Sequence, residues 1–155
     1  MLRLHKGVII VANIFDVASY ILKQYGAMSA MKLQKLCYYC QAWSLVWDDE
    51  PLFHENIEAW INGPVIPALY QKHKGIFKLD KNFFEDNHST LTETQKETIN
   101  TVCETYAKLN AQQLSDLTHN EAPYQIARKN LLPTERGHKI ISLADMSEYY
   151  SSLPK

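Results

Sequence analysis

Cysteine and histidine supply the most reactive side chains in this chain, and their spacing suggests metal chemistry. Cys37 and Cys40 form a Cys-x-x-Cys pair, a spacing used by zinc sites and by redox-active disulfides. His119 and Glu121 form the His-x-Glu pair of zinc deaminases, in which a Pro-Cys-x-x-Cys segment follows the glutamate. Here the cysteine pair precedes His119, and no cysteine follows Pro123. We therefore predict no metal site, and a metal-dependent hydrolase that uses His119, Glu121 and a cysteine stays an alternative.

Ser115, Asp116 and His119 combine the residue types of a catalytic triad. Ser115 and His119 lie four positions apart, so their side chains would be neighbours on one helix. The sequence contains no pattern for a strained nucleophile turn or an oxyanion hole, and no glycine-rich phosphate-binding or dinucleotide-binding motif. We therefore predict no catalytic residues and no cofactor, and we expect that the protein is not an enzyme.

The cysteine pair lies in the most apolar long segment, residues 30–47. From residue 33 onward this segment has few polar side chains apart from tyrosines: Gln34, Lys35, Gln41 and Ser44. A helix that is apolar nearly all round is buried on most sides, so we expect this helix to form the centre of the domain, with Ser29 as its N-cap. The two cysteines inside it should pack as small apolar groups.

Apolar periodicity, caps and glycine or proline stops predict the other elements. The expected helices span residues 14–25, 67–74, 93–109, 112–119, 123–129 and 142–153. Pro51–Phe53 and Ile57–Ile61 read as a short β-hairpin around residues 54–56, and residues 77–89 read as a loop. The fold class is therefore mostly α: a single compact helical domain, residues 14–153, around a central apolar helix, with one small β-hairpin. Residues 1–13 are expected to be an N-terminal extension.

Charge and composition argue against several partners. The 155 residues include 16 basic and 17 acidic side chains, for a net charge of −1. That balance predicts no nucleic-acid partner and no anionic membrane surface. No stretch approaches the ~18 apolar residues of a membrane span, and an odd number of cysteines, 3, disfavours a secreted disulfide framework. We therefore expect a cytoplasmic protein without a membrane partner.

The segment Ala59–Val65, with the sequence AWINGPV, is the most distinctive backbone signal. Asn62 and Gly63 both tolerate a positive φ, and Pro64 fixes its own φ near −65°. We expect a stiff corner that carries Trp60. Such a corner can serve as a structural elbow or as a rigid platform for a binding partner.

Four segments in a fixed order carry a resemblance to a known family. They are FDVASYILKQYG at residues 15–26, MSAMKLQKLCYYCQAWSLVWDDEPLF at 28–53, AWINGPV at 59–65 and LSDLTHNEAPYQIAR at 114–128. Their succession resembles the SocA-type antitoxins, also called the Panacea domain or phage-associated GepA-like proteins. The resemblance implies an antitoxin that neutralises a co-encoded protein toxin by direct protein–protein binding. One branch of the family implies an alternative, a proteolytic adaptor that delivers the toxin to a ClpXP-type protease.

Carried over residue by residue, the resemblance points to partner-binding positions and to turn positions. The expected partner-binding residues are Trp60, Val65, Thr118, His119, Tyr124 and Arg128. Gly63, Pro64 and Pro123 match as structural turn residues that shape the backbone. The family commonly has tryptophan where this chain has Tyr124. Because Trp, Tyr and Arg dominate the energetics of protein interfaces, Trp60, Tyr124 and Arg128 are the expected anchors.

Overall fold

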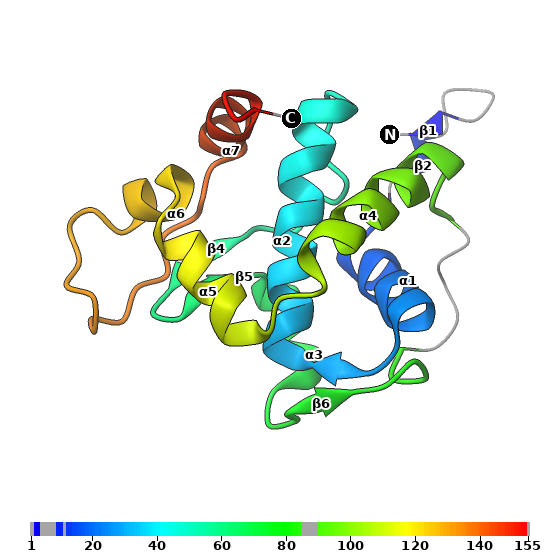
Figure 1. Ribbon diagram of the computed structural model, residues 1–155, viewed down its shortest axis with the longest axis horizontal. Coiled ribbons are helices and arrows are strands. Elements are labelled where there is room, and N and C mark those ends of the chain that lie inside the picture. The colour runs from blue at the N-terminus through cyan, green and yellow to red at the C-terminus, as the bar shows by residue number, and fades with distance from the viewer. Residues whose placement is uncertain (1, 4–8, 11, 85–89, 155) are drawn as a thin grey trace.

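A central helix organises the fold of the protein. The computed structural model describes residues 2–3, 9–10, 12–84 and 90–154. Helix α2, Ala30–Trp47, runs through the middle of the molecule and packs against four other helices, which lie on both of its sides (Figure 1). Those helices are α1 (Ile14–Tyr25), α4 (Glu93–Tyr106), α5 (Ala111–His119) and α7 (Leu143–Ser151). The prediction of a mostly α fold around this helix, with a small hairpin, is confirmed.

The burial of α2 follows from its composition. Its apolar residues occur on all sides, so every side needs a packing partner, and Leu33, Leu36, Tyr38 and Tyr39 are fully buried. The Ser29 hydroxyl accepts a hydrogen bond from the Lys32 amide at 3.1 Å, so the predicted cap and bounds are confirmed. No helix in the described part of the chain is long and apolar enough to cross a membrane.

Side-chain caps set most of the other helix boundaries. Asn13 forms a capping box with Asp16 at the start of α1, as the helix predicted over residues 14–25 requires. Helix α4 ends at Tyr106 rather than at residue 109. The reason is Asn110, which forms a capping box with Gln113 and therefore needs an extended backbone, with ψ at 174°. Two shorter helices complete the set, α3 (Pro67–His73) and α6 (Ala122–Ala127).

The predicted hairpin was wrong in its position. The strands are β4, Glu58–Trp60, and β5, Gly63–Val65, which pair antiparallel around a turn at Ile61 and Asn62. Residues 52 and 53 form no strand because a side chain of α2 satisfies their backbone groups. The Gln41 amide accepts from the Leu52 and Phe53 N–H groups at 2.7 and 3.2 Å and donates to the Phe53 carbonyl at 2.8 Å.

Two further strand pairs were not predicted. Strand β6, Lys78–Leu79, pairs antiparallel with β3, Met28–Ser29, within the segment expected to be a loop; residues 85–89 of that segment lie outside the described residues. Near the start of the chain β1, Leu2–Arg3, pairs with β2, Ile9–Ile10. The other residues of 1–11 lie outside the described part, so an N-terminal extension over residues 1–13 stays a prediction.

Candidate functional site

The β4–β5 hairpin accommodates a proline because of how its backbone is bonded. Pro64 lies opposite Ala59, and Pro64 has no N–H to donate. Ala59 needs no bond from it. The Ala59 N–H donates to the Lys139 carbonyl at 2.8 Å, and the Ala59 carbonyl accepts from Arg128 Nη1 at 3.0 Å. Both polar groups of Ala59 therefore point away from β5, and the proline sits where no ladder bond is required.

Side chains of α5 and α6 bind the carbonyl groups of the hairpin turn. The Tyr124 hydroxyl donates to the Trp60 carbonyl and lies 3.0 Å from the Ile61 carbonyl. The Ser115 hydroxyl donates to the Asn62 carbonyl at 2.6 Å. Arg128 binds the Ala59 carbonyl, as described above. The carbonyls of four successive residues, 59–62, therefore accept hydrogen bonds from side chains of residues 115–128. We call this set the carbonyl clamp: Ser115, His119, Tyr124 and Arg128.

His119 contributes to the carbonyl clamp through both ring nitrogens. Nε2 lies 3.0 Å from the Ile61 carbonyl oxygen, and Nδ1 lies 2.6 Å from the Ser115 carbonyl oxygen. Both partners are backbone carbonyls, so the ring lies between α5 and the hairpin. The ring also packs against Tyr124, with a centroid distance of 4.4 Å.

Arg128 links the carbonyl clamp to the loop that follows α6. Its Nη2 donates to the carbonyls of Leu132 and Glu135, at 3.1 and 2.6 Å. Its guanidinium carbon lies 5.9 Å from the centre of the Tyr124 ring, within cation–π range. Because one side chain bonds both the hairpin and this loop, it fixes the position of the loop residues 136–138 relative to Trp60.

A buried lysine lies beneath the hairpin. Gly63 has a φ of +123°, and a Cβ at this position would lie 2.6 Å from Cε of Lys35 and 3.3 Å from its Nζ. Lys35 is 1 % exposed, and its ammonium has no hydrogen-bond partner among the described residues. Burial lowers the pKa of Lys35 to about 7, because desolvation disfavours the charged form. Thr118, whose Oγ1 donates to the Ser115 carbonyl at 2.7 Å, lies on the same side of Gly63.

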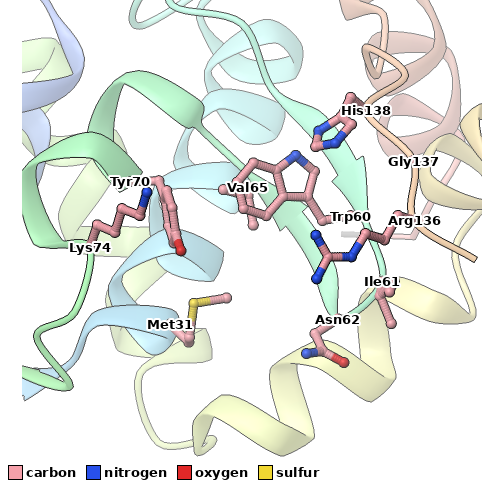
Figure 2. Close-up of a pocket in the computed structure, with 10 residues that line it drawn as sticks. All are labelled: Met31, Trp60, Ile61, Asn62, Val65, Tyr70, Lys74, Arg136, Gly137 and His138. Atoms are coloured by element: carbon pink, nitrogen blue, oxygen red, sulfur yellow. The ribbon is translucent and has the colours of Figure 1, made fainter. Parts of the chain in front are cut away.

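A pocket of about 470 Å³ opens beside Trp60 (Figure 2). Its residues come from the start of α2, the hairpin, α3 and the loop after α6. The lining residues are Met31, Trp60, Ile61, Asn62, Val65, Tyr70, Lys74, Arg136, Gly137 and His138. The Trp60 ring packs edge to face with Tyr70 and His138, at centroid distances of 5.0 and 5.6 Å. The indole N–H donates to Glu58 at 2.9 Å.

The structure brings the expected site residues together, in two different roles. Val65, Thr118, Tyr124 and Arg128 are 1 %, 0 %, 4 % and 7 % exposed, respectively. Thr118, Tyr124 and Arg128 pack inside the molecule, so a part in partner binding, which stays a prediction, would be indirect for these three, whereas Val65 also lines the pocket. Trp60 and His119 are half-buried, and of these two only Trp60 lines the pocket.

The turn residues expected from the sequence have identifiable positions. Gly63 has the positive φ, Pro64 pairs opposite Ala59, and Pro123 lies buried in the first turn of α6. Sequence reasoning missed the structural place of Lys35 and the pocket residues Tyr70, Lys74 and Arg136. Lys35 did give a signal, since it is a lone cation in the apolar part of α2. The pocket residues lie in no motif that could have identified them.

The residues considered for metal chemistry lie apart. Cys37 and Cys40 are fully buried free thiols, and burial raises the pKa of both, which disfavours the ligating thiolate. The Glu121 carboxylate accepts from the hydroxyls of Tyr39 and Tyr150 at 2.8 and 2.7 Å. Burial raises the pKa of Glu121, and these two bonds oppose that shift. Among the described residues, no three His, Cys, Asp or Glu side chains group so that they could hold a metal ion.

The residues considered for a triad have other partners. The Ser115 hydroxyl donates to the hairpin, and His119 faces the Ser115 carbonyl rather than its hydroxyl. Asp116 accepts a hydrogen bond from Gln112 at 2.9 Å on the exposed face of α5. The three side chains therefore do not form the ordered chain of hydrogen bonds that activates a serine.

Comparison with known proteins identifies the family. A family model described as "Antitoxin SocA-like, Panacea domain" matches residues 33–125, which include most of α2, the β4–β5 hairpin, α5 and the start of α6. No curated protein and no solved structure matches the chain. The matched segment is more than half of the 155 residues and contains most of the carbonyl clamp. The chain therefore belongs to the SocA-like antitoxins with a Panacea domain.

Proposed function

We propose that this chain neutralises a co-encoded protein toxin by binding it directly and stoichiometrically, and that the Trp60 side of the β4–β5 hairpin contacts the toxin. The observation that carries the proposal is the convergence of the family-like residues on this hairpin. Ser115, His119, Tyr124 and Arg128 all bond its carbonyl groups. They give the hairpin one conformation before any partner arrives.

A preformed conformation favours binding because ordering costs less on association. The free-energy cost of holding a loop in one conformation has already been met when the toxin docks. Trp60 then meets the toxin with its ring set by contacts with Tyr70 and His138. A half-buried tryptophan at the edge of a pocket is typical of an interface hot spot. The buried clamp residues would act through the hairpin rather than by contact.

The proposal has no catalytic step. The side chains that could carry one are already engaged. Glu121 accepts from two tyrosines, His119 faces two carbonyls, and burial keeps Cys37 and Cys40 as thiols. A near-neutral charge of −1 favours a protein partner over nucleic acid, and we propose that the protein works in the cytoplasm.

Co-expression with the adjacent open reading frame tests the proposal. The frame should stop growth when expressed alone and should permit growth when the intact chain is present. Trp60→Ala should weaken the rescue, whereas Trp47→Ala should not. Trp47 is the matched control because it is a 40 % exposed tryptophan at the end of α2, where it stacks on Trp43.

Two outcomes would contradict the proposal. Rescue that disappears only in cells without a ClpXP-type protease would favour the adaptor function instead. Equal rescue by Trp60→Ala and by the intact chain, at matched low expression, would show that the Trp60 side of the hairpin does not contact the toxin. Both Trp variants should be checked for equal soluble levels, because loss of folded protein also lowers rescue.

A further inference from the structure

We propose that the pocket beside Trp60 receives an acidic segment of the toxin, with toxin carboxylates bound by Arg136 and by Lys74, which lie on opposite sides of the pocket (Figure 2). This inference rests on the proposed function, since it names the chemistry of the toxin segment that the hairpin face binds. The apolar part of the same segment would pack against Trp60, Val65 and Met31.

The charge of the pocket differs from that of the whole chain. Its ten lining residues include Lys74, Arg136 and His138 and no Asp or Glu, although the chain as a whole has a net charge of −1. Glu58 lies next to the pocket, but its carboxylate already accepts from the Trp60 indole and lies 3.4 Å from His138. Among the described residues, Glu58 therefore lies beside Trp60 and His138, whereas Lys74 and Arg136 have no carboxylate within ion-pair distance.

Arg136 and Lys74 are available for a partner. In the described part of the chain, neither side chain has a hydrogen bond or an ion pair. Both residues are exposed. Figure 2 shows the Arg136 guanidinium directed into the space across from Tyr70 and Met31. A guanidinium presents parallel N–H donors that match the two oxygens of a carboxylate.

The floor of the pocket suits a carbon chain next to that carboxylate. Val65 is 1 % exposed and lies on the same face of the hairpin as Trp60, because Glu58 pairs with Val65 and Trp60 pairs with Gly63. Met31 supplies a flexible thioether that adapts to an irregular partner surface. Trp, Tyr, Met and Arg are the residue types enriched in protein interfaces. The lining therefore favours a peptide with an acidic and an apolar side chain.

The backbone at the pocket argues against a phosphate ligand. Phosphate sites use free backbone N–H groups at helix starts or in glycine-rich turns. The helix start that contributes to the pocket lining is that of α2, which supplies Met31. Two of its first three N–H groups are engaged, since the Ala30 N–H donates to the Phe77 carbonyl at 2.8 Å and the Lys32 N–H donates to Ser29. Recognition thus depends on side-chain cations, as for a carboxylate.

A double-mutant cycle with the toxin from the adjacent reading frame tests this inference. Binding is measured by isothermal titration calorimetry with the full-length antitoxin. Arg136→Gln and Lys74→Gln should each weaken binding at least tenfold, and Arg136→Glu at least a hundredfold. Lys108→Gln, which removes an exposed cation outside the pocket, should change the affinity less than twofold. All variants should keep the melting temperature of the intact chain, because these side chains are exposed.

The second half of the cycle neutralises each Asp and Glu of the toxin in turn. One of these toxin substitutions should weaken binding to the intact antitoxin at least tenfold. The same substitution should leave binding to the Arg136→Gln antitoxin almost unchanged. That non-additivity is the signature of a direct pair. Additive losses for every acidic toxin residue would overturn the inference.

Three further outcomes separate this inference from the proposed function. Unchanged toxin binding by both Arg136→Gln and Lys74→Gln would overturn the inference and leave the antitoxin role intact. No binding by the intact antitoxin would overturn both. Inorganic phosphate or ATP, titrated without toxin, should bind no better to the intact chain than to Arg136→Gln. If phosphate or ATP binds to the intact chain and this binding is lost in Arg136→Gln, the ligand of the pocket is a small anion rather than an acidic peptide, and the inference is overturned.

Discussion

The hydroxyl group of Tyr124 in α6 donates to the carbonyl of Trp60 in β4, 64 positions earlier in the chain. The same hydroxyl reaches the Ile61 carbonyl at 3.0 Å. The bond therefore joins the two sequence motifs that carry the family resemblance, one around Trp60 and one around Tyr124. It makes them parts of a single structural unit, in which the second motif fixes the backbone of the first.

Tyr124→Phe should lower the free energy of unfolding by about 1–3 kcal/mol, because the half-buried Trp60 carbonyl loses its donor. Urea denaturation measures the loss. Tyr149→Phe is the matched control, since the Tyr149 ring packs edge to face on Tyr150 at 4.9 Å and its hydroxyl has no hydrogen bond among the described residues. Equal losses in the two variants would show that the hydroxyl of Tyr124 does not support the hairpin.

Gly63→Ala should cost more stability than Gly75→Ala. Both glycines have a positive φ, +123° and +83°, so both substitutions carry backbone strain of about 1–3 kcal/mol. Only at Gly63 would the new Cβ also approach another atom, Cε of Lys35, whereas Gly75 has nothing within 4 Å. Thermal denaturation of the two variants compares the costs. Equal shifts in melting temperature would contradict the close approach.

Lys35→Met should raise the free energy of unfolding at pH 7. Methionine is similar in length and leaves no polar group unpaired in this buried position, whereas the Lys35 ammonium has no hydrogen-bond partner among the described residues. Lys32→Met is the contrasting variant, at a half-buried position one turn earlier in α2. It removes an ammonium that is hydrogen-bonded, since Lys32 Nζ donates to the Ala107 carbonyl. That variant should be destabilised.

The advantage of Lys35→Met should shrink as the pH rises. The pKa of Lys35 is lowered to about 7 in the folded protein, whereas an unfolded lysine titrates near ~10.4. Above pH 7 the folded state has lost the proton and the unfolded state keeps it, so the stability of the intact chain rises by up to about 1.4 kcal/mol per pH unit. Conversely, this stability falls away as the pH drops toward 7.

Urea denaturation of both proteins at pH 7, 8 and 9 measures the change. Taking the difference between the two cancels the titration of other groups, such as the cysteines and Glu121. A constant difference across this range would contradict the lowered pKa of Lys35.

Trp60→Ala should affect toxin binding more than folding. Removing a hot-spot anchor costs at least about 2 kcal/mol of binding free energy, which is more than tenfold in affinity. The melting temperature should fall less than in Phe53→Ala, because Phe53 is 0 % exposed and belongs to the core. A fall as large as that of Phe53→Ala would assign Trp60 to the core rather than to the interface.

Helices were predictable where local chemistry decides their ends. Ser29 and Asn13 cap α2 and α1 at the expected residues because a cap needs only the next three residues of the chain. The hairpin was misplaced because a distant side chain decides it. Gln41, in α2, satisfies the backbone of residues 52 and 53, and no local pattern indicates that.

Sequence motifs predicted which residues belong to the candidate site but not what each residue does there. Motif matching selected Thr118, Tyr124 and Arg128, yet only the folded chain reveals that all three are buried and that Tyr124 and Arg128 bond the hairpin. Arg136 and Lys74 come from two segments without a motif. They share a pocket because helix α3 and the loop that follows α6 both flank the hairpin. This proximity exists only in the tertiary fold.

Titration of the purified toxin with the purified antitoxin tests the central claim most directly. Toxin activity is recorded as the antitoxin is added, and the two proteins are kept well above their dissociation constant. Stoichiometric masking predicts that activity falls linearly and reaches its floor at one antitoxin chain per toxin, with full recovery when the complex is dissociated. Complete loss of activity at a strongly substoichiometric amount of antitoxin would mean turnover and would contradict the account.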